Sequence, residues 1–318
     1  MSTRLKTAGR FTDGGKQLSF DFNGKQLKGV EGDTLASALL ANDQMMVGRS
    51  FKYHRPRGIV ASGGEEPNAL FNMGYTNTFE PNQRATTTEL FDGAKIRSQN
   101  HWPTLEFDVG ALNTYLSRFL PAGFYYKMFM YPRAFWKHVY EPIIRQSAGL
   151  GKAPRAEDRD PDTYEHVYFF ADVMVVGGGI AGLQAAKAAA LTGVKVLLVE
   201  QTAHWGGRAP VDGGEVNGLP VDKYVDNLVA ELSAMENVTM RTRLMGAGVY
   251  DHGYTLGYER LTDHAPNIVG PRHRLWRIRA GHIVTATGAI ERPISFAGND
   301  IPGVMLASAV RDYAVNFG

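Results

Sequence analysis

Alternating apolar and polar positions mark the first ordered part of the chain. Residues Leu18–Phe22 follow the two-residue period of a strand with one buried face. Asn23-Gly24 comes next and is a strong signal for a two-residue hairpin turn, so Lys25–Val30 is predicted to be the returning strand. Gly32-Asp33-Thr34 then offers a helix N-cap, and the amphipathic run Leu35–Ala41 predicts a short helix.

Three further short apolar runs predict more strands in the same region. They are Ile59–Ala61, Thr88–Phe91 and Ala94–Arg97, the last two around a turn at Asp92-Gly93. A strand, a turn, a second strand and then a helix at this spacing are typical of the start of a β-grasp domain. We place this domain at residues 17–104.

Residues 105–165 differ in character from the segments on either side. The region is punctuated by prolines, contains an aromatic-rich stretch at Phe119–Tyr140 and ends in the charged linker Arg155–Asp162. The aromatic stretch is interrupted by Pro121, Lys127, Pro132, Arg133 and Lys137, and it has no run of about 20 apolar residues that would span a membrane. We interpret 105–165 as an interdomain connector or contact surface, with contact to a membrane as the alternative for the aromatic stretch.

The pattern after the connector predicts a strand, a helix and a second strand. Asp172–Val176 has the composition of a buried strand, and the Ala-rich run Ile180–Leu191 predicts a helix with Gly193 as its C-cap. Lys195–Val199 is the second strand. This βαβ unit begins a dinucleotide-binding domain of Rossmann-like α/β fold, which we place at 166–318.

The rest of this domain gives weaker signals. Pro220–Met235 is predicted to be a helix with one apolar stripe, and Val238–Arg241 a short strand. Leu275–Arg279 and His282–Thr285 are interpreted as the two arms of a hairpin, with Ala280-Gly281 as its turn.

The composition is that of a globular protein. A length of 318 residues suggests about two domains at the usual ~100–200 residues per domain. With 44% hydrophobic and 21% charged residues, a sizeable core is expected. The net charge of +2 creates no field for a polyanion, so nucleic acid is not an expected partner. The polar N-terminus has no apolar signal segment, and a cytoplasmic location is expected.

The absence of cysteine removes several classes of chemistry. Without cysteine, the chain cannot form a disulfide and has no thiolate nucleophile. It also cannot hold a cysteine-ligated iron–sulfur cluster or zinc ion. Disulfide reductases of the flavoprotein type need a redox Cys pair, so that reaction is excluded within this chain. The histidines are scattered, and we predict no metal site and no catalytic residue.

The segment Gly177–Gly182 carries the strongest chemical signal. It fits the pattern G-x-G-x-x-G, follows a predicted strand and opens a predicted helix. Gly177 would allow the tight turn, Gly179 the approach of a pyrophosphate to the backbone, and Gly182 the close packing of helix and strand. The backbone amides near Ile180 and Ala181 would bind the phosphates at the helix N-terminus.

An acidic residue ends the second strand of the βαβ unit. Glu200, followed by Gln201, is positioned to accept hydrogen bonds from the hydroxyls of an adenosine ribose. A 2′-phosphate would be repelled there, which disfavours NADP. Glu200 suits the ribose of NAD and that of FAD equally well, and the residues alone do not choose between them.

Three other segments are candidate parts of the same site. His204–Arg208 resembles the Gly-Gly segment that lines the diphosphate in flavoproteins with two dinucleotide-binding domains, which implies that role for Gly207, and Arg208 could neutralise one phosphate; the alternative is a solvated loop. Val284–Ala289 contains Ala286-Thr287-Gly288 and resembles the A-T-G strand of flavoproteins with two dinucleotide-binding domains, which implies that Thr287 and Gly288 lie beside the cofactor; the alternative is a plain strand end. Backbone from Leu244–Val249, with Ala247 as the candidate, would meet the adenine.

The densest cationic run is Phe51–Gly58, which contains Lys52, His54, Arg55 and Arg57. It could hold an anion or a partner chain, or form a solvated loop. His54 has no second ligand at metal-binding spacing.

A family resemblance follows from two runs and from the order of the parts. Ser50–Ile59, followed by Glu65–Ala69, resembles the alpha subunit of heterotetrameric sarcosine oxidase and the related alpha subunits of amine and opine oxidases. Ile301–Met305 resembles the run just before that family's second nucleotide domain. The β-grasp domain, aromatic connector, Gly-rich βαβ unit and A-T-G segment also occur in the family's order.

The resemblance implies a fold, cofactors and partners. The first domain would be similar to a 2Fe–2S ferredoxin without cluster ligands. Gly177–Gly182 would hold NAD, with FAD as the alternative. The complex would oxidatively demethylate sarcosine with O2, giving glycine, hydrogen peroxide and a one-carbon unit for tetrahydrofolate. Its catalytic flavin would lie in a beta subunit, and FAD and FMN would both be present.

The chain departs from the family pattern at its end. It stops at Gly318, where a second nucleotide domain would begin, so we expect a fragment with an incomplete dinucleotide domain. Two other functions stay open. One is the alpha subunit of an opine or amino-acid oxidase or dehydrogenase, and the other is a non-catalytic assembly module that binds a dinucleotide.

Overall fold

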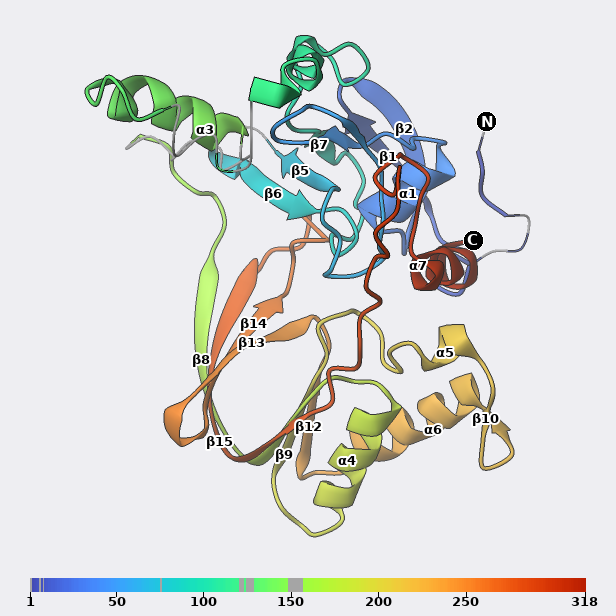
Figure 1. Ribbon diagram of the computed structural model, residues 1–318. Helices are drawn as coiled ribbons and strands as arrows, with labels where there is room; N and C mark the ends of the chain where they lie inside the picture. The colour runs from blue at the N-terminus through green and yellow to red at the C-terminus, as the bar shows by residue number, and fades with distance from the viewer. Residues whose placement is uncertain are drawn as a thin grey trace. The chain divides into compact units, whose positions relative to one another are not determined.

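The computed structural model describes residues 2–5, 7, 9–74, 76–119, 123, 129–147 and 157–318. The chain divides into two compact units, one formed by Met1–Pro161 with Glu291–Gly318 and the other by Asp162–Ile290 (Figure 1). The segment 291–318, which the sequence analysis assigned to the range 166–318, thus packs with the first unit. Within the expected connector 105–165, Pro121, Lys127 and Pro154 lie outside the described residues. The predicted domain ranges 17–104, 105–165 and 166–318 are not tested by this division into two units, and they stay predictions from the sequence.

A five-stranded mixed sheet in the order β2-β1-β7-β5-β6 forms the first unit. Its strands are β1 (Gln17–Phe22), β2 (Lys25–Val30), β5 (Leu70–Met73), β6 (Glu80–Arg84) and β7 (Lys95–Arg97). Strands β1 and β2 pair antiparallel as the predicted hairpin, and β1 pairs parallel with β7. The two-residue strands β3 (Gly48–Arg49) and β4 (Pro56–Arg57) form a separate hairpin.

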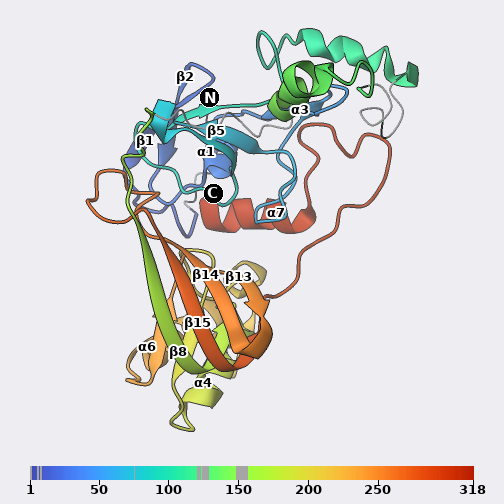
Figure 2. The same ribbon diagram turned by 90° about the vertical axis from the view of Figure 1, so that its left-hand side faces the viewer.

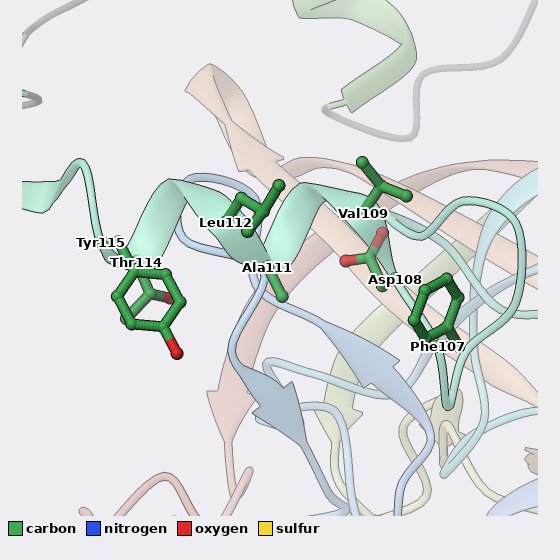
Figure 3. A pocket seen from close by; sticks show the side chains of 7 residues that line it. All are labelled: Phe107, Asp108, Val109, Ala111, Leu112, Thr114 and Tyr115. Carbon is green, nitrogen blue, oxygen red and sulfur yellow. The ribbon is translucent and has the colours of Figure 1, made fainter.

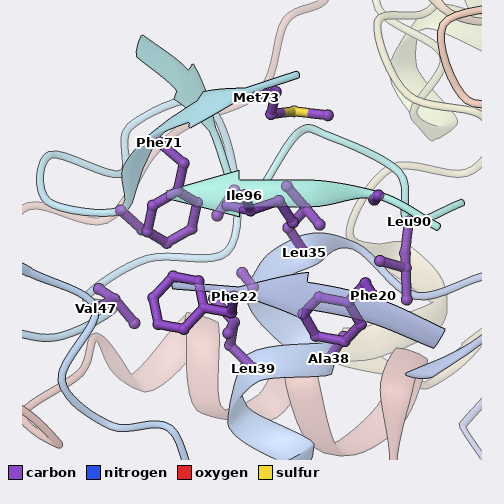
Figure 4. Packing of buried hydrophobic residues seen from close by; sticks show 14 of the residues in the cluster. Phe20, Phe22, Leu35, Ala38, Leu39, Val47, Phe71, Met73, Leu90 and Ile96 are labelled. Carbon is purple, nitrogen blue, oxygen red and sulfur yellow. The ribbon is translucent and has the colours of Figure 1, made fainter. Parts of the chain in front are cut away.

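Helix α1 (Leu35–Ala41) packs on this sheet and begins at a capping box. The Ser37 N–H donates to Thr34 Oγ1 at 3.2 Å, and the Thr34 N–H donates to Ser37 Oγ at 2.9 Å, so two N-terminal amides are satisfied. The helix buries Leu35 and Leu39 against the sheet side chains Phe20, Phe22, Phe71 and Ile96 (Figure 4). The predicted hairpin and first helix are therefore confirmed.

Within the described ranges of the first unit, the other helices are short. They are α3 (Glu141–Ser147), α7 (Ala307–Asp312), 3-10 helices at Thr76–Thr78, Val109–Thr114 and Ser117–Phe119, and π-helical turns at Trp136–Tyr140 and Tyr313–Phe317. Several large side chains along 102–143 are exposed, among them Phe107, Tyr115 and Tyr131. Among the residues that the structure describes, no helix is long and apolar enough to cross a membrane.

The second unit contains a six-stranded sheet in the order β12-β9-β8-β15-β14-β13. Figure 2 shows strands β8, β15, β14 and β13 of this sheet side by side. The strands of the sheet are β8 (Tyr164–Val176), β9 (Val196–Val199), β12 (Val238–Arg241), β13 (Leu244–Tyr250), β14 (Tyr254–Arg260) and β15 (His273–Thr285). Strand β8 pairs parallel with β9 and with β15, β9 pairs parallel with β12, and β13 and β14 pair antiparallel beside β15. The other elements are α4 (Ile180–Ala190), α5 (Ala209–Asp212), α6 (Val221–Ser233), β10 (Glu215–Val216), β11 (Leu219–Pro220) and a 3-10 turn at Asp251–Gly253.

Two hydrophobic layers lie on opposite faces of β8 and β9. Val196 and Leu198 pack with buried side chains of α4 and α6. Their neighbours Leu197 and Val199 belong to a second cluster with Leu244, Trp276 and Ile278. Since successive strand residues point to opposite faces, the continuous apolar run of β9 means that both faces are covered.

The predicted hairpin over 275–285 is wrong, because these residues belong to one strand. Strand β15 runs without a turn from His273 to Thr285 and pairs with β8 along its length. A Cβ at Gly281 would approach the Asp172 carbonyl oxygen to 2.9 Å. The glycine thus serves close strand packing, although the sequence analysis interpreted it as a turn residue.

Two other predicted strands are also wrong. The structure has no strand over Ile59–Ala61, and Thr88–Phe91 contributes only an isolated bridge between Thr34 and Glu89. Ile59, Ala61 and Leu90 are nevertheless buried. Their apolar patterns indicated burial correctly, but irregular loops deliver these side chains to the core. The strands β5 and β6 were not predicted, because their residues show no clear alternation of apolar and polar positions.

The substitution Leu198→Ala should lower the free energy of unfolding of the second unit by about 2–5 kcal/mol, because it empties a fully buried site between β9 and the helices. Leu191→Ala is the matched control, since Leu191 is 69% exposed just after α4 and should change stability by less than about 0.5 kcal/mol. Urea denaturation of both variants measures the difference. Equal effects would contradict the two-layer packing.

Candidate dinucleotide site

The Gly-rich turn joins the end of β8 to the start of α4. Gly177 has a φ of 110°, which L-residues with side chains rarely adopt. Its N–H donates to the Val199 carbonyl at 2.8 Å, and an added Cβ would overlap with the Ala286 carbonyl. Gly177 is therefore required both by its backbone conformation and by the approach of the chain after β15.

The other two motif glycines have different surroundings. A Cβ at Gly182 would overlap with the Gly177 carbonyl oxygen, so α4 packs directly on the turn. A Cβ at Gly179 would have no heavy atom within 4 Å, and its backbone is extended at φ −72° and ψ 177°. The chain thus leaves open space at the position expected for a pyrophosphate. Ile180 and Ala181 form the adjacent first turn of α4, the helix end that attracts anions.

Glu200 is buried at the end of β9 and already holds two backbone amides. Its Oε2 accepts from the Gly178 N–H at 2.7 Å, and its Oε1 accepts from the Thr202 N–H at 2.8 Å. This anchoring of the Gly-rich turn was not expected from the sequence. An ionised carboxylate has further lone pairs, so it can still accept hydrogen bonds from a ribose. Gln201 beside it is exposed.

The segment after Glu200 folds back onto the Gly-rich turn. The Gly206 N–H donates to the Gly178 carbonyl at 2.8 Å, and Gly179 and Gly206 form a parallel bridge. A Cβ at Gly207 would lie 3.2 Å from the Gly179 Cα. A Cβ at Gly178 would meet the Trp205 ring at 2.5 Å. Trp205 lies within the run 204–208, but its residue pattern predicted no role for it.

Arg208 follows Gly207 directly in the chain and stands at the start of α5. Its side chain is 37% exposed, and its Nη2 is 3.4 Å from Asp212 Oδ1. An exposed pair of this kind contributes little to stability. The contact of the guanidinium with a phosphate stays a prediction.

Two more predicted segments lie at the same end of the sheet. The Ala286 N–H donates to the Val176 carbonyl at 2.8 Å, which places Thr287 and Gly288 directly after it beside the turn; both are exposed. Strand β13 has a bulge at Ala247, because Gly246 pairs with Gly257 and Gly248 with Leu256.

Strand β13 also approaches the end of β8. A Cβ at Gly246 would lie 3.1 Å from Val176 Cγ1. The structure thus brings the predicted residues together at the carboxyl ends of β8, β9 and β15 and along β13. This is the edge at which α/β sheets bind ligands. That these residues contact a cofactor stays a prediction.

The cationic run 51–58 has partners within the chain. Arg55 Nη2 donates to Asp300 Oδ1 at 3.1 Å, and Arg57 also pairs with Asp300. His54 Nδ1 lies 2.6 Å from Asp108 Oδ2. Burial alone would raise the pKa of Asp108, but hydrogen bonds from the Trp102 N–H, His54 and the Gly110 N–H lower it. Asp300 and Asp108 thus supply carboxylate partners for Arg55, Arg57 and His54 within the chain.

A surface hollow of about 390 Å³ lies beside Asp108 (Figure 3). Its walls are largely apolar, with Phe107, Val109, Leu112 and Tyr115 along the 3-10 helix Val109–Thr114. The Asp108 carboxylate is engaged by the donors just described. Since binding sites combine an apolar wall with converging polar groups, we do not assign a ligand to this hollow.

Two family models match parts of the chain. Residues 15–101 match the 2Fe-2S iron-sulfur cluster binding domain, and residues 172–243 match the FAD dependent oxidoreductase family.

Curated relatives match more of the chain. It is 48% identical over 319 residues to the alpha chain of sarcosine oxidase from Rhizobium meliloti (strain 1021), covering 100% of this chain and 32% of the relative. It is 35% identical to the corresponding alpha chain from Corynebacterium sp. (strain U-96), covering 98% and 28%. A subunit of the opine oxidase of Agrobacterium tumefaciens (strain Ach5) is 28% identical over 45% of this chain and 28% of its own length. The chain spans about a third of the curated relatives that it matches over its whole length.

One solved structure supports the fold of both units. The match to L-proline dehydrogenase from P. horikoshii covers 98% of this chain and 49% of the dehydrogenase chain, with a TM-score of 0.61 and 23% sequence identity. With the two family matches, this confirms the expected fold class, a ferredoxin-like β-grasp domain followed by a Rossmann-like domain of the FAD/NAD(P)-binding type.

The 2Fe–2S cluster named by the first family description does not fit this chain. Such clusters are held by Cys thiolates, and the sequence has no Cys. Within the described ranges there is also no group of three or more Cys, His, Asp or Glu side chains that could hold a metal. A dinucleotide does fit the second unit, because the space at Gly179 is open beside a helix N-terminus and a buried carboxylate.

Gly182→Ala should destabilise the second unit by several kcal/mol, since the added Cβ overlaps with the backbone of the turn. Gly179→Ala should leave thermal stability nearly unchanged, because its Cβ enters open space and the backbone is extended. Thermal unfolding of the two variants, without added ligand, compares the same substitution three residues apart. A stable Gly182→Ala protein would contradict the packing of α4 on the turn.

Proposed function

This chain is homologous over its full length to sarcosine oxidase alpha subunits, and from this premise we propose that it binds a dinucleotide at Gly177–Gly182 as part of such a subunit. The observation that carries the proposal is the open space at Gly179, beside the first turn of α4 and Gly207. A Cβ at Gly178 or Gly182 would collide with a neighbour, while one at Gly179 would have no heavy atom within 4 Å.

Each residue of the site has a defined task in this proposal. The first turn of α4 binds the pyrophosphate with Ile180 and Ala181 amides, and Arg208 offsets one phosphate charge. Glu200 accepts hydrogen bonds from the adenosine ribose while it holds the Gly178 amide. The backbone of Ala247, at the bulge of β13, contacts the adenine. Thr287 and Gly288 lie next to the cofactor.

The identity of the dinucleotide has two candidates. NAD is our assignment by analogy with the alpha subunits, and FAD is the alternative that the match to the FAD dependent oxidoreductase family supports. When bound, either would supply a ring that accepts or donates a hydride. The carboxylate of Glu200 in both cases disfavours a 2′-phosphate.

We place the chemical step outside this chain. The complex would oxidise sarcosine with O2 to glycine and hydrogen peroxide, and pass the one-carbon unit to tetrahydrofolate. The catalytic flavin would lie in the beta subunit, with FAD and FMN both in the complex. This chain would contribute dinucleotide binding and contacts to other subunits, with a small secondary amine as the substrate.

Two other functions remain as candidates. The partial similarity to the opine oxidase of Agrobacterium tumefaciens favours opines as the second candidate substrate class. A non-catalytic assembly module that binds a dinucleotide is the third candidate.

Gly179→Val should abolish dinucleotide binding while both units stay folded, because the side chain occupies the pyrophosphate space. The protein is purified, denatured, and the released cofactor identified by chromatography. Gly64→Val is the matched control, since it is another glycine with open space, in the first unit. Unchanged cofactor content in Gly179→Val would refute the site. Release of FAD would replace the NAD assignment but keep the site.

The substrate assignment is checked on the complex assembled with its partner subunits. Oxygen uptake should be supported by sarcosine and be at least about tenfold slower with opines, a difference of ~1.4 kcal/mol in barrier. A complex that oxidises opines and leaves sarcosine unchanged would overturn the first assignment and favour the second.

A further inference from the structure

The loop 58–69 of the first unit is built around one buried carboxylate. Glu66 is 1% exposed. Its Oε2 accepts from the N–H groups of Val60 at 2.8 Å and Ala61 at 2.7 Å, and its Oε1 accepts from those of Asn68 at 2.7 Å and Ala69 at 3.0 Å. Four backbone donors from two stretches of the loop therefore converge on one internal anion.

The outward side of the same loop holds the C-terminal segment. The Val60 carbonyl accepts from the Leu306 N–H at 2.9 Å, and the Ala61 carbonyl accepts from the Tyr313 hydroxyl at 2.9 Å. The two residues that donate their N–H groups inward to Glu66 thus present their carbonyls to segment 291–318. The Ala61 N–H and the Val60 carbonyl belong to one planar peptide unit, so the carboxylate sets the direction of the Val60 carbonyl. The Ala61 carbonyl lies in the next peptide unit along the chain.

The contact between this loop and the segment is extensive. Ala61, Leu306 and Ala309 form a buried cluster, with Val60, Met305 and Tyr313 packed around it. A Cβ at Gly58 would lie 2.7 Å from the Pro302 Cα, so the two backbones touch directly. At the neighbouring cationic run, Arg55 and Arg57 bind Asp300 of the same segment.

Converging backbone N–H groups form an anion-binding concavity, the kind of site that holds phosphates and iron–sulfur clusters in other proteins. The first unit matches a cluster-binding family but has no thiolate to hold a cluster. Its concavity at loop 58–69 is filled by a side chain of the same loop.

We infer that the buried Glu66 carboxylate acts as an internal anion that positions loop 58–69. The first unit thereby serves as a receptor for segment 291–318 and has no redox role. Glu66 is a positioning residue in this role, since it acts on the segment only through Val60 and Ala61. The inference does not depend on the dinucleotide or on the substrate.

The test compares amide hydrogen exchange in full-length variants of this chain. In Glu66→Gln one oxygen is replaced by an NH2 group that faces two N–H donors. The amides of Val60, Ala61, Asn68 and Ala69 should exchange at least about tenfold faster, and those of 306–313 should follow. Glu65→Gln is the matched control with the same charge change one residue away, and it should leave these rates unchanged.

Tyr313→Phe tests the order of the interactions from the other side. It removes the hydroxyl that binds Ala61 and leaves Glu66 untouched. Exchange over 306–313 should rise about fivefold, while the four amides on Glu66 keep their protection. In both variants exchange over 162–290 should stay unchanged, which separates a positioning effect from general destabilisation.

The outcomes decide each part of the inference. If the four amides keep their protection in Glu66→Gln, the role of Glu66 as an internal anion is overturned. Loss of that protection with 306–313 unaffected would overturn the receptor role. If Glu66→Gln does not fold, Tyr313→Phe tests whether the Ala61 carbonyl holds the segment, and an unchanged segment in that variant would overturn the receptor role.

Discussion

The crossing of three backbone segments at the end of β8 is the constraint on which the second unit depends. The Gly177 carbonyl lies against Gly182 of α4, and Gly177 itself lies against the chain after β15. No side chain fits at either contact, so α4 can start close to the sheet only because both positions are glycine. This proximity fixes the direction of α4, the burial of Leu183 and Ala186 behind it, and the open space at Gly179 in front of it.

Carboxylates organise the loops of this cysteine-free chain. Glu200 joins the Gly-rich turn to the strand beside it through two backbone amides. Asp33 accepts from the Val30 N–H and from Ser37 at the start of α1, and Arg4 pairs with it. Asp108 does the same for the turn at Trp102 and Gly110. Buried charge is costly unless it is hydrogen-bonded, and Glu200, Asp33 and Asp108 each accept a hydrogen bond from at least one backbone N–H.

The sequence predicted the parts that local pattern controls. The first hairpin and α1, the βαβ unit and the residues of the Gly-rich turn follow from spacing, caps and glycine positions that act within about 30 residues. The single strand β15 was missed because the need for Gly281 arises from β8, which lies more than a hundred residues earlier. Ile59 and Leu90 show the opposite case, since their apolar patterns record burial without specifying a strand. The roles of Trp205 and of Glu200 as an anchor depend on contacts that no local pattern contains.

The two units treat backbone donors in opposite ways. In the second unit the space in front of the Gly-rich turn is left open, while the nearby Glu200 is used at the turn's edge. In the first unit Glu66 fills the concavity, and Val60 and Ala61 turn outward to segment 291–318. A filled concavity binds no external anion, because a second negative charge would meet the buried carboxylate at low dielectric. The loop amides of the first unit are therefore satisfied from within the chain, because the Glu66 carboxylate accepts all four of them.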